Sequence, residues 1–312
     1  MTARILALHG GLLALLPALH FLLPVYHHGN LARIMVLACY AIGYNLLFGY
    51  TGLLSLGHAM FFAAGMYGMG MALYHLGLGA ELAFLAGIAA AGGLALVVGL
   101  LALRTVGVAF MIVTLMFSQA FYLAILLAAR WTRGDEGLVL AGADRVLFGL
   151  DLTDPDIRFL LALGLFALCL SATLWLVRRP FGRVLVAIRE NPERAELLGY
   201  DIFRHKLAAV VMSGLFSGAA GAAYGLMFGY VGASFAEVHF SIFPLLWVLL
   251  GGAGTVIGPF FGVLFMFYLI DISSGLTPAY MLVAGVALVL LTLFAPQGLM
   301  GEVRRRWLRW LP

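Results

Sequence analysis

Charged residues are scarce in this chain. Of its 312 residues, only 10% are Asp, Glu, Lys or Arg, while 64% are hydrophobic. Soluble domains contain about a quarter charged residues, and a soluble core could not hide so much apolar surface. The apolar residues instead form repeated blocks of about 20 residues, the length that crosses a bilayer as a helix. The composition therefore excludes a soluble domain and predicts a membrane protein.

The alternation of polar and apolar residues that β-barrel strands require is also missing. The blocks are continuously apolar and rich in Leu, Ala and Gly. Because backbone groups in lipid must be hydrogen-bonded within the protein, continuous apolar blocks indicate helices. The predicted fold is an all-α polytopic membrane protein, a single transmembrane domain over 1–312. Some of its helices should be broken by glycine or re-entrant, and one short helix should lie in the cytoplasm.

Cysteine and lysine are nearly absent. Cys39 and Cys169 each lie in an apolar block, where a cysteine usually acts as a small buried hydrophobe, and their spacing supports no disulfide or metal site. The one lysine, Lys206, belongs to no GxxxxGK[ST] phosphate loop, so the chain cannot hold ATP phosphates by that route. No His, Asp and Glu residues stand at metal-ligand spacing, and no nucleophile has a base nearby. We expect no enzyme activity, no cofactor and no metal.

Ten apolar segments are predicted to cross the membrane. The first follows Arg4, is too long for the apolar part of a signal peptide and precedes no small-x-small cleavage site, so we interpret it as a retained span. A later apolar stretch divides at GGAGTVIGP, whose glycines and Pro259 interrupt a helix. The expected spans are 5–25, 31–49, 53–76, 80–103, 106–129, 157–177, 207–230, 240–254, 257–272 and 278–295.

Basic residues predict the orientation. Segment 178–206 has seven Arg or Lys against four acids, and the tail 297–312 has four Arg against Glu302, whereas loop 130–158 has six acids against four Arg. Because Arg and Lys accumulate on the cytoplasmic side, we expect 178–206 and both termini in the cytoplasm and 130–158 in the periplasm. The net charge of +4 thus reflects topology and not nucleic-acid binding.

Ionisable residues are rare within the predicted spans. Glu81, Glu237 and Asp271 fall near outer ends, which leaves His9, His20 and His58 as the titratable residues at depth. Secondary carriers coupled to protons or sodium usually keep ionisable groups in the membrane as ligands for the coupling ion. This scarcity weighs against such a carrier.

A short helix is predicted within the basic segment 178–206. Asn191 is a favourable N-cap, Pro192 fits the first turn, and Glu193 complements the positive end of the helix dipole. Gly199 supplies a left-handed C-terminal stop. These signals predict a helix over 192–198, which is too short to be stable alone in water.

Two interpretations of this helix stay open. It could simply rest on the surface of its own chain. It could also dock a cytoplasmic partner, with Ala195, Leu197 and Leu198 as the contact surface and Arg194 and Glu196 beside it.

Glycines interrupt two apolar blocks near the N-terminal third of the chain, and polar residues lie between them. Small residues at this spacing favour close helix packing, but broken helices lining a translocation path fit the pattern as well. His58 alone is more often a packed, hydrogen-bonded residue than a proton relay. The glycines are Gly43, Gly49, Gly52, Gly57, Gly65, Gly68 and Gly70, and the candidate path residues are Asn45, Thr51, Ser55, His58, Gly251, Gly252 and Gly254.

Several motifs, in order along nearly the whole chain, resemble one family. Segment 193–199 is similar to the cytoplasmic "EAA" loop of ABC importer permeases, although Arg194 stands where Ala is usual. GYNLLFGYTGLLSLGHAMFFAAGMYG at 43–68 resembles the signature of LivM-type branched-chain amino acid permeases. Further similarity lies in RTVGVAFMIVTLMFSQAFY, TRGDEGL, the run from Gly182 to Ala223, LLGGAGTVIGPFFG and APQGL.

The resemblance implies a permease subunit of an ATP-binding-cassette importer in a bacterial inner membrane. A homologous permease, two ATPase subunits acting through 193–199, and a periplasmic substrate-binding protein would complete the system. Loop 130–158 could contact that binding protein or simply be solvated. The substrate would be a branched-chain or other hydrophobic amino acid. Urea or a short-chain amide is an alternative substrate, and a stand-alone secondary transporter or channel is an alternative function.

Overall fold

The structure is a computed structural model that describes residues 2–307, and it is an all-α membrane-protein fold. Within these residues, six helices are long and apolar enough to cross a membrane. Shorter apolar helices accompany them. The six candidate spans are α2 (Val25–Asn45) with the π-helical turn η1 (Leu46–Tyr50), α4 (Ala80–Ala102), α5 (Val108–Leu127), α7 (Pro155–Arg178), α10 (Ile202–Phe228) and α12 (Gly258–Leu276).

The remaining elements are shorter or less apolar. They include two two-stranded antiparallel pairs, in which β1 pairs with β4 and β2 pairs with β3. The helices are α1 (Thr2–Leu22), α3 (Ala59–Leu76), α6 (Ala129–Thr132), α8 (Pro180–Glu190), α9 (Pro192–Leu197), α11 (Val238–Gly251), α13 (Tyr280–Phe294), α14 (Gly298–Arg306) and the 3-10 turns η2 (Gly142–Asp144) and η3 (Ala233–Ala236). The strands are β1 (Leu138–Val139), β2 (Val146–Leu147), β3 (Leu150–Asp151) and β4 (Tyr230–Val231).

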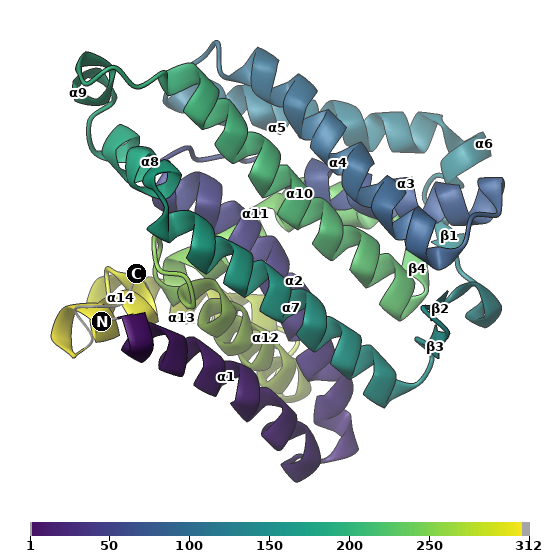
Figure 1. Ribbon diagram of the computed structural model, residues 1–312. Helices are drawn as coiled ribbons and strands as arrows, with labels where there is room; N and C mark the ends of the chain where they lie inside the picture. Colours follow the sequence, from purple (N-terminus) through teal and green to yellow (C-terminus); the bar gives the residue numbers. More distant parts are fainter. Residues whose placement is uncertain (1, 308–312) are drawn as a thin grey trace.

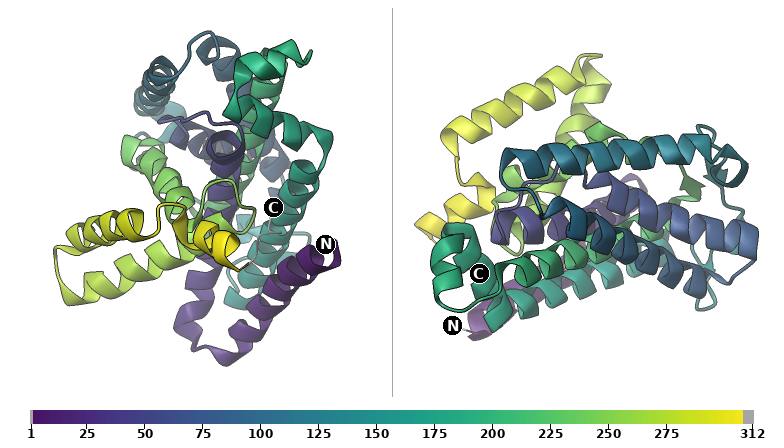
Figure 2. Two further views of the ribbon diagram at one scale, coloured as in Figure 1. Left: turned by 90° about the vertical axis from the view of Figure 1, so that its left-hand side faces the viewer. Right: turned by 90° about the horizontal axis from the view of Figure 1, so that it is seen from above.

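Helix α2 runs through the centre of the bundle, and nearly all its residues from Leu31 to Leu47 are buried. α3, α4 and α10 pack together on one side of it, while α7, α11 and α12 pack around the rest (Figure 1). α13 lies at the rim, and most of its large apolar side chains are exposed (Figure 2). A helix with an apolar outer face is suited to contact lipid or another subunit rather than water.

The bundle has two distinct ends. α8, α9 and α14 lie at one end together with the start of α1, and α6 and the four strands lie at the other (Figure 1). The basic segment 178–206 and the acidic loop 130–158 are therefore at opposite ends, as the orientation predicted from charge requires. Which end faces the cytoplasm stays a prediction.

Glycine allows α3, α4 and α10 to approach closely. A methyl group added at Gly65 would lie 2.1 Å from the carbonyl oxygen of Gly218, and one at Gly221 would lie 1.9 Å from that of Phe62. A Cβ at Gly87 would lie 2.4 Å from the carbonyl oxygen of Gly65. Small residues permit such backbone contact between membrane helices, where packing rather than burial from water drives association.

Most expected spans coincide with a helix to within a few residues, with one clear exception. Residues 53–76 do not form a continuous helix, because α3 begins only at Ala59 and residues 51–58 are not helical. The count of ten crossings therefore stays a proposal, whereas the all-α polytopic class is confirmed.

Candidate functional site

The short helix α9 is capped as the sequence predicts. The Asn191 side-chain oxygen accepts a hydrogen bond from the backbone N–H of Arg194 at 2.9 Å, and Pro192 occupies the first turn. Gly199 has a φ of +87°, in the left-handed region where a side chain would be strained. Local signals at each end of the segment are therefore sufficient to define this helix.

Only part of the predicted contact surface of α9 is available to a partner. Ala195 is buried against Val184 and Ile188 of α8, so it holds α9 on its own chain. Leu197 and Leu198 are instead 88% and 70% exposed. The charged residues of α9, Glu193, Arg194 and Glu196, are also exposed. The leucines thus form the free apolar surface of α9.

Helix α8 was not among the expected elements, although its first residue is Pro180, a residue favoured at the start of a helix. Its inner face buries Gly182, Val184, Leu185 and Ile188. Through Asn191, α8 continues directly into α9. The two helices therefore form one unit, held by the apolar face of α8.

The first glycine-rich segment contains a true break in the helical path, defined here as residues 51–58. The Thr51 hydroxyl donates to the Leu46 carbonyl at 3.0 Å, and Gly52 turns the chain with a φ of +76°. Side chains from neighbouring helices bond the backbone of this break: the Tyr44 hydroxyl donates to the Ser55 carbonyl at 2.9 Å, and Ser241 accepts from the Ala59 N–H at 2.9 Å. Irregular backbone at membrane depth requires partners of this kind.

A second break, defined here as residues 252–257, separates α11 from α12. Asn45, the last residue of α2, bonds the second break. Its amide nitrogen donates to the Thr255 carbonyl at 2.9 Å, and its amide oxygen accepts from the Gly254 N–H at 2.9 Å. One buried side chain therefore satisfies a donor and an acceptor that the second break leaves without helical partners.

Two arginines contact the breaks from the end that holds α9. Arg189, on α8, donates to the carbonyl of Gly49 in η1, while Arg304, on α14, donates to the Gly254 carbonyl at 3.3 Å. Space here is tight, since a Cβ at Gly49 would lie 1.9 Å from the Asn45 amide oxygen. The paired breaks are thus connected through Arg189 to the helix that carries α9.

His58, at the end of the first break, is hydrogen-bonded through one ring nitrogen, while its buried Nδ1 has no partner among the described residues. Its Nε2 lies 3.1 Å from the Ser213 hydroxyl and 2.9 Å from the Ser217 hydroxyl. The two hydroxyls donate to the Gly43 and Ser213 carbonyls, at 2.5 and 2.8 Å. Each hydroxyl has one proton, so both can only accept from His58, and Nε2 must carry the ring proton. This geometry fits a packed, hydrogen-bonded histidine.

All the candidate path residues are buried in this conformation. Asn45, Thr51, Ser55 and His58 are at most 2% exposed. Gly251, at the end of α11, and the second-break glycines Gly252 and Gly254 are buried as well. The structure brings Asn45 and Gly254 into direct contact. Ser55 and His58 instead bond other residues, Tyr44 and Ser217 respectively.

An aromatic pocket that the sequence analysis did not identify lies between α2, α11 and α12. Its volume is about 260 Å³. Periodicity could not separate these residues from ordinary core or lipid-facing residues, because aromatic side chains are common in both. The lining residues are Leu37, Phe240, Phe243, Trp247, Phe267, Ile270, Asp271 and Ser274.

Comparison with known proteins gives one consistent result. A family model described as the permease component of branched-chain amino acid transport systems matches residues 28–293. The chain is 30% identical over 295 residues to the high-affinity branched-chain amino acid transport system permease protein LivM of Escherichia coli strain K12. The same identity holds for LivM of Salmonella typhimurium strain LT2, and each alignment covers 86% of this chain and 69% of the relative.

A shorter similarity is found in an archaeon. Over 90 residues, 37% are identical to the probable branched-chain amino acid transport permease protein LivM of Methanocaldococcus jannaschii, which covers 28% of this chain and 26% of that relative. No solved structure is significantly similar to this chain. The chain is therefore a member of the branched-chain amino acid transport system permease family.

Proposed function

We propose that this chain is the translocation subunit of an importer for branched-chain or other hydrophobic amino acids, driven by ATPase subunits on separate chains. Membership of the permease family supports transport as the activity. The absence of a phosphate-loop motif from the sequence agrees with an external energy source. The LivM relatives are permease proteins of branched-chain amino acid transport systems, which supports the substrate class.

The observation that carries this proposal is the exposed apolar surface of α9. Leu197 and Leu198 stand exposed at the end of a short capped helix in which, among the residues that the structure describes, only Ala195 is buried. Exposed leucines at the hydrophilic end of a membrane bundle are costly unless a partner covers them. A helix in a groove of an ATPase subunit would bury this apolar face.

The contacts of α8 suggest how movement of such a partner would reach the membrane. Motion of α9 moves α8, because Asn191 links them without a spacer. Arg189 of α8 bonds the π-turn residue Gly49, and Asn45 ties the neighbouring backbone to the second break. A shift of α8 would therefore act on both breaks together. Broken helices commonly form the substrate site around which membrane transporters change access from one side to the other.

The aromatic pocket and the acidic loop 130–158 are the surfaces from which we infer the substrate path and the remaining partners. The aromatic pocket between α11 and α12 suits an aliphatic side chain, and Asp271 and Ser274 supply polar groups at its edge. A homologous permease subunit would complete the path. A periplasmic binding protein would dock on the acidic loop 130–158, and the protein would lie in the bacterial inner membrane with both termini in the cytoplasm.

Co-purification tests the assembly. A gently solubilised, tagged subunit should bring with it a homologous permease and ATPase subunits, and uptake by proteoliposomes of this complex should require ATP. Aliphatic amino acids should compete for uptake, whereas urea or a short amide should not. Transport without ATP by a homo-oligomer of this chain would contradict the proposal and support a stand-alone transporter or channel.

Two variants test the docking helix. Leu197→Asp places a charge on the exposed apolar surface, and Gly199→Pro is incompatible with the left-handed turn at +87°. Both should uncouple ATP hydrolysis from uptake while membrane insertion stays normal. Leu197→Met is the matched control, because it keeps an apolar side chain of similar volume. Normal uptake by either Leu197→Asp or Gly199→Pro would show that α9 is not the docking element.

A further inference from the structure

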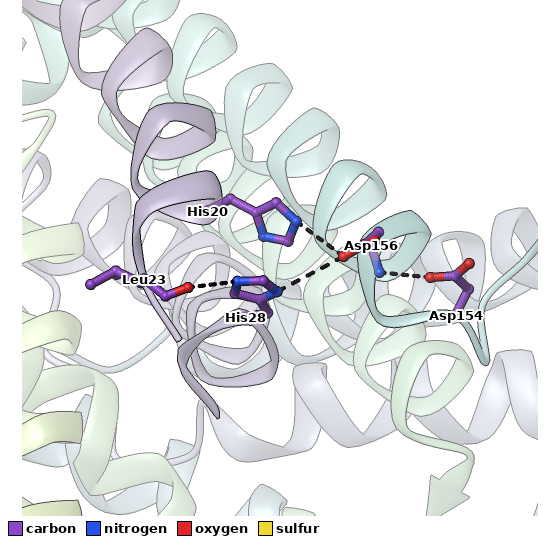
Figure 3. Close-up of polar contacts among 5 residues, drawn as sticks. All are labelled: His20, Leu23, His28, Asp154 and Asp156. Atoms are coloured by element: carbon purple, nitrogen blue, oxygen red, sulfur yellow. Dashed lines mark hydrogen bonds and ion pairs between the residues drawn. The ribbon is translucent and has the colours of Figure 1, made fainter. Parts of the chain in front are cut away.

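Three potential metal ligands meet at the end of the bundle opposite α9. His20 comes from the last turn of α1, His28 from the first turn of α2, and Asp156 from the first turn of α7. One ligand atom of each lies within 4.8 Å of the others (Figure 3). The sequence predicts no metal site and places His20 at membrane depth. The fold instead brings His20 to Asp156 at the start of α7, 136 positions away.

The distances fit a tetrahedral metal ion. His20 Nε2 is 3.1 Å from an Asp156 carboxylate oxygen, and His28 Nδ1 is 3.8 Å from the same oxygen. Nitrogen and oxygen ligands lie about 2.0–2.2 Å from Zn²⁺, so ligand atoms at tetrahedral angles are about 3.3–3.6 Å apart. The two observed distances bracket this range. In the structure His20 Nε2 donates a hydrogen bond to the Asp156 carboxylate, so an ion bound by all three atoms would displace that proton and take its place between the two groups.

A separate contact prepares the His28 ring for coordination. The other ring nitrogen, Nε2, lies 3.1 Å from the Leu23 carbonyl oxygen (Figure 3). A carbonyl can only accept, so Nε2 carries the proton and Nδ1, the nitrogen that faces Asp156, presents a lone pair. Metal-ligating histidines commonly donate their second N–H to a backbone carbonyl in this way. At 3.8 Å, His28 Nδ1 is too far from Asp156 for a hydrogen bond, so this lone pair is available.

The surroundings of the cluster leave one open side. The imidazoles of His20 and His28 are only 10% and 14% exposed, and the His20 ring stacks on Phe159 with centroids 4.2 Å apart. The Asp156 side chain is 69% exposed. An ion could enter from the solvent at Asp156 and keep water as a fourth ligand. Three protein ligands with one open position are typical of many zinc sites.

We propose that His20, His28 and Asp156 bind one Zn²⁺ ion, which fastens α1 to the start of α2 and α7. Two imidazoles and one carboxylate suit zinc better than the oxygen-seeking ions Mg²⁺ and Ca²⁺. The bound ion would join the first helix, which has an exposed outer face, to the central bundle. The proposal does not depend on what the chain transports or on its ATPase partners.

Zinc titration of the full-length chain tests the site. The protein is purified in detergent with a histidine-free tag, stripped with a chelator, and titrated with Zn²⁺ in competition with a chromophoric chelator. The wild type should bind one ion per chain, and His20→Gln and His28→Gln should each weaken binding at least tenfold. His27→Gln is the matched control, because His27 Nδ1 lies 2.9 Å from the Tyr268 hydroxyl and is outside the cluster.

A second readout keeps the result independent of misfolding. Zn²⁺ should raise the thermal unfolding temperature of the wild type and of His27→Gln but not that of His20→Gln, provided that the three unliganded proteins unfold at similar temperatures. If the wild type binds Zn²⁺ no more tightly than His20→Gln, or if His27→Gln loses affinity equally, the proposal is wrong. Neither result would affect the docking role of α9, which is tested by uptake.

Discussion

A single side chain next to the breaks supplies hydrogen bonds that a continuous helix would make through its own backbone. Asn45 is 1% exposed and bonds both Gly254 and Thr255. An amide side chain suits this place, because it offers a donor and an acceptor side by side. The sequence singles out Asn45 only as a polar residue in an apolar block. Its partners lie 209 and 210 positions away, a separation at which no local pattern shows the pairing.

Asn45→Ala should therefore destabilise the protein. It leaves the Gly254 N–H and the Thr255 carbonyl buried without their partner, at a cost of about 1–3 kcal/mol each. The measurement is the free energy of unfolding in mixed detergent micelles. Ser274→Ala is the control, since Ser274 is exposed and bonds only a carbonyl of its own helix. Equal stability of the two variants would show that the Asn45 bridge contributes nothing.

Among whole elements, α9 was predictable and α8 was not. Asn191 and Gly199 mark the ends of α9 by local chemistry that needs no tertiary structure. α8 lies among basic residues that suggest a solvated loop, and its helix depends on burying Val184, Leu185 and Ile188. This burial depends on the other helices against which α8 packs, and the sequence does not show them. The contact of Arg189 with Gly49 could not be predicted from the sequence for the same reason.

Arg189→Ala should weaken coupling between α8 and the breaks. Hydrogen bonds from charged groups contribute about 1.5–3 kcal/mol, so uptake is expected to fall about 10- to 100-fold if this contact forms during transport. The measurement is ATP-dependent uptake by the assembled complex, with ATP hydrolysis followed in parallel. Arg183→Ala, an exposed arginine on the same helix, is the control. Uptake that is equal in both variants would exclude Arg189 as the link.

Close packing of α3, α4 and α10 gives a further prediction at this scale. Gly65→Ala would place a methyl group 2.1 Å from the Gly218 carbonyl oxygen and force the helices apart. Overpacking of this kind costs about 1–3 kcal/mol. Gly93→Ala, on α4, meets no atom within 4 Å and should be neutral or stabilising by up to about 1 kcal/mol. Thermal unfolding in detergent compares the two, and equal unfolding temperatures would contradict the packing argument.

At the scale of the whole molecule, the sequence predicts the helical class and the separation of the basic and acidic segments to opposite ends. Apolar block length and charge asymmetry are local quantities, and the membrane turns them directly into spans and sides. The cluster of His20, His28 and Asp156 could not be foreseen, because three helices must first assemble before it exists. The positions of functional side chains thus depend on tertiary packing, whereas the membrane topology can be predicted from the lengths of the apolar blocks and the distribution of charge.

The direction of the bundle in the membrane decides the proposed function, and cysteine labelling can measure it. Both native cysteines, Cys39 and Cys169, are buried, so background labelling should be low. Leu197→Cys and Val139→Cys each place a thiol at an exposed position, 88% and 71% exposed, at opposite ends of the bundle. In intact cells stripped of the outer membrane, a membrane-impermeant maleimide should label Val139→Cys but not Leu197→Cys. Permeabilised cells that produce the subunit without its ATPase partners should label both, because no docked partner then covers position 197. Labelling of Leu197→Cys from outside would place α9 where no ATPase subunit can reach it, and the importer mechanism would then be untenable whatever the family relationship.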